Sequence, residues 1–144
     1  MPRTVLACIF LAAALVGEPS AARACSCASP VSAEAALERA SAAFSGQVTK
    51  IVRPLLDRLG LTDSGEHEVK FLVIRTWKGM VGPEVMVRTR LTGEACGYPF
   101  VLGRAYLVFV REILPGIETG ICTGTRDLAD ADEEVQALDA VTEK

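Results

Sequence analysis

The sequence predicts a small, mainly β domain with one helix before its strands and one after them. Between residues 44 and 124, five or six short segments alternate apolar and polar side chains, and glycine or proline turns separate them. Apolar residues with helical spacing occur on either side of this region. This order favours a small antiparallel barrel or a sandwich, and the pattern alone does not choose between the two.

Residues 1–24 have the three parts of a secretory signal peptide. A basic residue near the start precedes the unbroken apolar run 5–16, and residues 22–24 have the small-x-small form that signal peptidase cleaves. The run is shorter than the ~20 residues that cross a bilayer. The alternatives are an uncleaved N-terminal helix and a lipoprotein modified at Cys25. We expect cleavage and a single domain of residues 25–144, located outside the cytoplasm as a secreted or periplasmic protein.

The first element of this domain is predicted to be a helix that is capped by Ser32 and ends near Ala42. Its apolar stripe has steps of four, three and four residues and comprises Ala33, Leu37, Ala40 and Phe44. A second helix is predicted near the C-terminus, with Asp130 and Glu133 as a capping box. Its stripe comprises Leu128, Ala131, Val135 and Leu138.

The strands are predicted between these two helices. The segment 67–77 gives the strongest signal, because Val69, Phe71 and Val73 share one face. Residues 55–66 are expected to form a long connection. The predicted strands are 44–52, 67–77, 84–91, 97–101, 105–112 and a last short strand at 116–124 that carries Cys122.

Composition argues against several functional classes. A formal net charge of −3 and an aromatic content of 6% do not favour a nucleic-acid or anionic-membrane partner. His67 is the single histidine, and no second histidine exists for a zinc site of the chain's own. We expect His67 to be a solvated strand residue and Trp77 to lie in the core or at the barrel rim. We therefore expect a protein that is not an enzyme and needs no cofactor.

Four cysteines follow residue 24, and an even number in an exported chain predicts two disulfides. They are Cys25, Cys27, Cys96 and Cys122. A bridge between the first two would close a strained ring. Either remaining pairing ties the N-terminus to two distant points and closes loops of about seventy to a hundred residues, worth about 4 kcal/mol each in the chain-entropy model. A zinc site is the alternative, but the spacing lacks the paired C-x-x-C units of structural zinc sites.

Three features together give the chain a resemblance to a known family. It has a Cys-Ser-Cys start at the predicted cleavage site, Cys-Gly-Tyr-Pro-Phe at 96–100, and Ile-Cys-Thr-Gly-Thr-Arg-Asp-Leu at 121–128. These features resemble the N-terminal domain of the tissue inhibitors of metalloproteinases and the wider netrin-like module family, with its small bacterial members. The resemblance implies an OB-type five-stranded barrel flanked by helices. It also implies the disulfides Cys25–Cys96 and Cys27–Cys122.

The chain departs from the animal inhibitors in two respects. It lacks their further disulfides and their second cysteine-rich domain. Two residues, Ala28 and Ser29, also separate the second cysteine from Pro30, whereas the proline follows more closely in the family.

The resemblance implies that the free amine and the carbonyl oxygen of Cys25 chelate the catalytic zinc of a target metalloprotease. Ser26, Cys27 and Ala28 would then contact the target pocket, and Glu94 and Ala95 would flank it. The zinc belongs to the target, so no metal of the protein's own is expected, and we expect a monomer. The alternative is a netrin-like protein-binding module without inhibitory activity, in which the cysteines only fasten the terminus.

Overall fold

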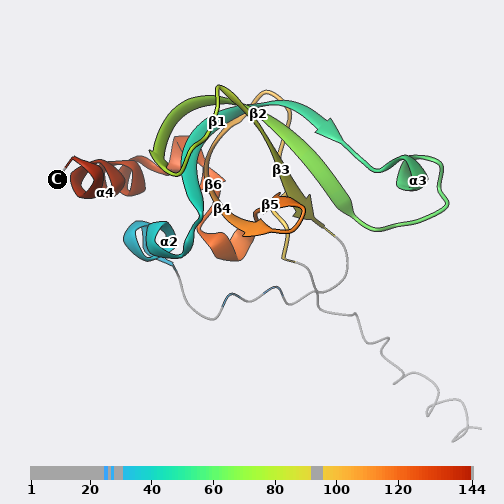
Figure 1. Cartoon of the computed structure of the whole chain (residues 1–144), viewed down its shortest axis with the longest axis horizontal. Coiled ribbons are helices and arrows are strands. Elements are labelled where there is room, and N and C mark those ends of the chain that lie inside the picture. Colours follow the sequence, from blue (N-terminus) through green and yellow to red (C-terminus); the bar gives the residue numbers. More distant parts are fainter. Residues whose placement is uncertain (1–24, 26, 28–30, 92–95, 144) are drawn as a thin grey trace, which may run out of the picture.

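A closed β-barrel is the central feature of the computed structural model, which describes residues 25, 27, 31–91 and 96–143 (Figure 1). Five strands are hydrogen-bonded in the order β1-β2-β3-β5-β4, and pairing of β4 with β1 closes the ring. Only the β3–β5 pairing is parallel among these described strands. The strands are β1 (Ala42–Val52), β2 (Glu66–Lys78), β3 (Glu84–Arg90), β4 (Ala105–Ile113), β5 (Gly116–Glu118) and the short β6 (Arg126–Asp127). The prediction of a mainly β, OB-like barrel is confirmed.

The two predicted helices are present with different ends. Helix α2 (Ala33–Arg39) begins at Ser32, whose hydroxyl accepts a hydrogen bond from the Ala35 N–H at 3.3 Å. It stops before the predicted end at Ala42, because Ser41 N–H already bonds to the Val110 carbonyl at 2.9 Å and leads into β1.

The C-terminal helix α4 (Asp132–Thr142) begins later than predicted, and the Asp130–Glu133 capping box is wrong. Asp127 instead caps a preceding 3-10 turn, η3 (Leu128–Asp130), by accepting from the Ala129 N–H at 3.0 Å. Helix α4 starts after this turn without a side-chain cap. None of the described helices is long and apolar enough to cross a membrane.

Two predicted strands take other forms. Residues 97–101 form no strand, because Tyr98 bonds to a side chain: its N–H donates to Thr89 Oγ1 at 2.7 Å. Cys122 lies in the 3-10 turn η2 (Ile121–Thr123) rather than in a strand, so of the predicted strand 116–124 only β5 (Gly116–Glu118) forms. The predicted connection 55–66 contains a one-turn helix, α3 (Leu55–Arg58).

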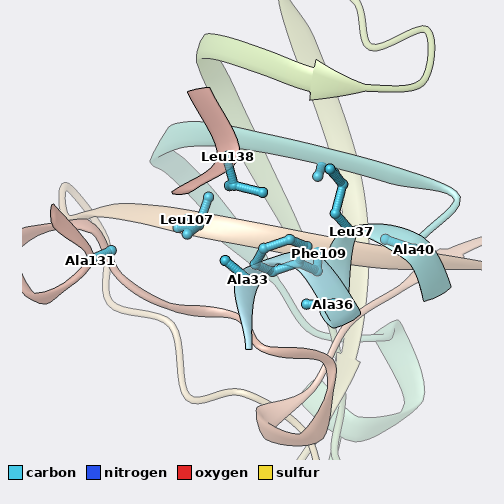
Figure 2. Packing of buried hydrophobic residues seen from close by; sticks show 9 residues of the cluster. Ala33, Ala36, Leu37, Ala40, Leu107, Phe109, Ala131 and Leu138 are labelled. Atoms are coloured by element: carbon cyan, nitrogen blue, oxygen red, sulfur yellow. The ribbon is translucent and has the colours of Figure 1, made fainter. Parts of the chain in front are cut away.

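The core has two layers that share β4. Tyr106, Val108 and Val110 point into the barrel, where they join a cluster with Phe44, Val48, Val69, Phe71 and Val87. Leu107 and Phe109 point to the other side, and Figure 2 shows them gathered with residues of α2 and with Leu138 of α4. Residues 106–110 of β4 are therefore apolar on both faces, as a strand segment with no solvated side must be, whereas residues 111–113 at its end are exposed.

Two polar groups of β2 hold α4 against the barrel. Trp77 Nε1 donates to Asp139 at 2.6 Å, and Arg75 bonds to the same carboxylate at 2.6 Å while its guanidinium lies 5.3 Å from the Trp77 ring centre. Trp77 is half-buried against the outer core layer, which agrees with its expected place at the core or rim. His67 is partly buried on β2, rather than fully solvated as expected.

A pair of leucine substitutions tests the outer core layer. Leu138→Ala removes a side chain that is 0% exposed, so we expect it to lower the free energy of unfolding by ~2–5 kcal/mol. Leu102→Ala is the matched control, because Leu102 is 62% exposed and should change stability by less than about 0.5 kcal/mol. Urea denaturation measures both values. Equal effects would show that α4 does not pack as described.

Candidate functional site

Two disulfides fasten the segment around Cys25 and Cys27 to the barrel. Cys25 pairs with Cys96 and Cys27 pairs with Cys122, with Cα–Cα distances of 5.5 and 5.3 Å. These are the pairings that the family resemblance implies. Cys25 is exposed and Cys27 is partly buried. Two disulfides are compatible with an extracytoplasmic protein, and no group of acidic, histidine and cysteine residues that could hold a metal is found among the described residues.

Cys96 and Cys122, to which the N-terminal cysteines are bonded, lie side by side because the backbone at residue 96 touches the backbone at residues 120–121. The Ile121 N–H donates to the Cys96 carbonyl at 2.9 Å. The contact needs a glycine, since a Cβ added at Gly120 would lie 2.2 Å from the Cys96 oxygen. Likewise, a Cβ at Gly97 would lie 2.0 Å from the Arg90 carbonyl oxygen. We call these residues, Cys96, Gly97, Gly120, Ile121 and Cys122, the cysteine seat.

Buried threonines fix the seat to the core. Phe109 lies in a gap on one edge of β4, between the stretch that pairs with β5 and the stretch that pairs with β6. Thr125 Oγ1 accepts from the Phe109 N–H at 3.0 Å, and Thr119 Oγ1 donates to the Phe109 carbonyl at 2.8 Å. The two hydroxyls are 2.7 Å apart. The N–H and carbonyl of Phe109, which β5 and β6 leave without a strand partner, therefore hold Thr119 before Cys122 and Thr125 after it.

Thr123 extends this network into η2 itself. Its hydroxyl donates to the Gly120 carbonyl at 2.7 Å and lies 3.0 Å from Thr119 Oγ1. Gly124 then ends the turn with a φ of 97°, a conformation that favours glycine. The turn that carries Cys122 is therefore fixed by side-chain hydrogen bonds as well as by its disulfide.

The surface around the cysteines is hollowed. Arg111, Cys122 and Thr123 are shared by two depressions of about 100 and 130 Å³. Arg39 lines the first and Arg90 the second. A third depression of about 440 Å³ lies beside Cys27. The first two are smaller than the ~300–1,000 Å³ of typical small-molecule pockets, and the third falls within that range.

The structure brings together four of the predicted site residues, the cysteines. The other four, Ser26, Ala28, Glu94 and Ala95, lie outside the described residues. The sequence analysis missed the threonines that support the seat and the close approach that Gly97 and Gly120 permit. The glycine that follows Cys96 in the sequence was the one local signal of this close approach.

No protein-family model matches the chain, and no curated protein matches it.

A glycine substitution tests the contact within the seat. Gly120→Ala would place a methyl group against the Cys96 carbonyl, so we expect a loss of ~1–3 kcal/mol in unfolding free energy. Gly82→Ala is the control, because the nearest atom to its added Cβ is 3.6 Å away. Urea denaturation of the oxidised proteins compares the two. Wild-type stability of Gly120→Ala would contradict the close approach.

Proposed function

We propose that this protein, once cleaved before Cys25, inhibits a zinc metalloprotease through its new N-terminus. The observation that supports this is the placement of Cys25: it is exposed, yet it is tied to the same rigid seat as Cys27. The two bridges, which start within three residues of each other, fix both ends of the segment 25–27 on the barrel. The proposal rests on cleavage at the predicted site and on the family resemblance of the cysteine pattern.

The chemistry follows from the free α-amine that cleavage would give to Cys25. The amine nitrogen and the carbonyl oxygen of the same residue can close a five-membered chelate ring on a metal. A catalytic zinc site in a protease has three protein ligands and one open position. A ligand in that position displaces the water that attacks the substrate. The inhibitor itself contributes no metal.

The proposed chelation requires a neutral amine. An α-amine has an ordinary pKa of about 7.7–8.0, so it loses its proton at little cost near neutral pH. Because the protonated amine cannot bind zinc, inhibition should weaken as the pH falls below this range, by up to tenfold per unit. The bridges would also lower the entropy lost on docking, because a preorganised ligand orders few groups when it binds.

Inhibition by two forms of the protein tests the proposal. One form begins at Cys25, and the other carries one extra alanine before Cys25. The extra residue removes the chelating amine and keeps both disulfides. Assayed against a panel of zinc metalloproteases, the first form should inhibit at least one member, and the second should inhibit it at least 100-fold more weakly. Intact mass, lower by four hydrogens than that of the reduced chain, verifies both disulfides in each form.

The other outcomes contradict the proposal in different ways. Equal inhibition by both forms would place the inhibitory surface elsewhere on the barrel. No inhibition by either would favour the alternative, a netrin-like binding module in which the cysteines fasten the terminus. A lipid mass on Cys25 in the exported protein would show that its amine and location are not those proposed.

A further inference from the structure

Two arginines line the depression of about 100 Å³ beside Cys122. Arg39 comes from the last turn of α2 and Arg111 from β4. Both side chains are exposed, and neither forms an ion pair in the part of the chain that the structure describes. No acidic residue is among the described residues that line this depression. We call it the arginine depression, and its wall carries two positive charges and no negative one.

The acidic side chains that are nearest in the sequence do not line the arginine depression. In α2, Glu34 and Glu38 share one stripe of the helix, and Arg39 is turned about 100° away from Glu38 toward the depression. On β4, Glu112 directly follows Arg111, and successive side chains of a strand point to opposite faces. These carboxylates therefore leave both guanidinium groups without an acidic partner at the depression.

Glu118 is the acidic residue of the adjoining depression of about 130 Å³. It lies opposite Arg111 in the pairing of β4 with β5, yet no ion pair joins the two among the described residues. Arg90 lines the same depression, and its guanidinium lies 3.4 Å from a carboxylate oxygen of Glu66. Over both depressions, three arginines thus face two carboxylates even when Glu66 is counted, and the surplus positive charge lies on the side of Arg39.

A carboxylate on an apolar stem fits this combination of groups. A guanidinium presents parallel N–H donors that match the two oxygens of a carboxylate. Val31, Phe109 and Cys122 supply apolar wall next to the arginines, and this wall suits the methylene groups of an aspartate or glutamate side chain. At about 100 Å³, the depression is smaller than the ~300–1,000 Å³ of pockets that enclose small molecules. Its size therefore suits one side chain of a protein.

The arginine depression lies close to Cys25. Two residues of extended chain span at most ~7 Å, and the Cα atoms of Cys27 and Cys122 are 5.3 Å apart. The Cα atom of Cys122, which lines the depression, is therefore within about 12 Å of the Cys25 Cα atom. A standard protein interface buries about 800 Å² per partner, which corresponds to a disc of ~16 Å radius. An interface centred on Cys25 thus extends as far as the depression.

We propose that the arginine depression binds a carboxylate, and that its occupant is an acidic side chain of the protein that contacts Cys25. The occupant rests on the proposed function, which makes that protein the target metalloprotease. Charged groups across an interface speed the encounter of the partners and fix their orientation. Arg39 and Arg111 would therefore select proteases that carry an aspartate or glutamate beside the active-site cleft. The two arginines bind the carboxylate of the target and take no part in zinc chelation.

Inhibition by the chain that begins at Cys25 tests the occupant. Arg39→Gln/Arg111→Gln removes both charges, and we expect it to raise the inhibition constant about tenfold for a sensitive protease, with a smaller loss at high salt. Arg53→Gln/Arg58→Gln is the matched control, because these arginines are also exposed and form no ion pair within the described residues. The control makes the same change in net charge and should alter the inhibition constant less than about twofold.

Direct binding of a carboxylate is measured without a protease. The probe is N-acetylglutamate amide, which carries one side-chain carboxylate, and N-acetylglutamine amide is its neutral counterpart. In ¹⁵N–¹H spectra, we expect saturable shifts of the Arg39, Arg111 and Thr123 amides with the first compound and none with the second. Arg39→Gln/Arg111→Gln should weaken this binding about tenfold, and the control variant should leave it unchanged.

All the substituted arginines are exposed, so circular dichroism and the urea midpoint should match the wild type and exclude misfolding. No saturable shift in the wild type, or unchanged binding in Arg39→Gln/Arg111→Gln, would overturn the carboxylate site. Tighter binding of inorganic phosphate than of N-acetylglutamate amide would also overturn it. Equal changes of the inhibition constant in both variants would overturn the occupant. Carboxylate binding without inhibition of any protease would support the site and contradict the inhibitor proposal, and with it the protease as occupant.

Discussion

The burial of residues 106–110 of β4 on both faces is the constraint on which the rest of the structure depends. Its inward side chains complete the barrel interior, and Leu107 and Phe109 form the floor on which α2 and α4 pack. Its backbone bonds to β1 on one edge and to β5 and β6 on the other. A charged side chain placed at any position from 106 to 110 would therefore be buried, either inside the barrel or in the layer beneath α2 and α4.

The gap on the edge of β4 connects this core to the cysteines. Phe109 has its N–H and carbonyl in that gap, and a buried backbone group without a partner costs free energy. Thr119 and Thr125 satisfy both groups, and the chain between them forms the turn that carries Cys122. The position of the Cys27 anchor thus follows from hydrogen bonding in the core, and the Cys96 anchor follows from its contact with Ile121. The cysteine seat is thus carried by loops on the barrel, as is common where loops carry function on a rigid scaffold.

The sequence predicted what depends on local pattern. Val69 and Phe71 alternate with exposed residues because β2 has one face inside the barrel, and Ser32 caps α2 through a bond three residues away. It could not predict what long-range pairing decides. Residues 97–101 have a strand-like alternation, yet Tyr98 and Phe100 enter the barrel cluster from a loop whose backbone partner is the Thr89 side chain.

The candidate site shows the same division. The number of cysteines predicted two disulfides, but the residues alone left two pairings open, and the choice came from the family resemblance. Only the fold places Cys96 beside Cys122. The supporting role of Thr119 and Thr125 depends on a gap in the pairing of β4, for which no local pattern exists.

Backbone ¹⁵N relaxation at Cys27, in a chain that begins at Cys25, tests most directly whether the cysteine seat holds the N-terminus in the rigid state that chelation needs. A terminus fixed by two bridges to the seat should give an order parameter of about 0.85, the value of rigid backbone. A value below about 0.6 would mean a flexible terminus, and it would contradict a preorganised zinc-chelating group at Cys25.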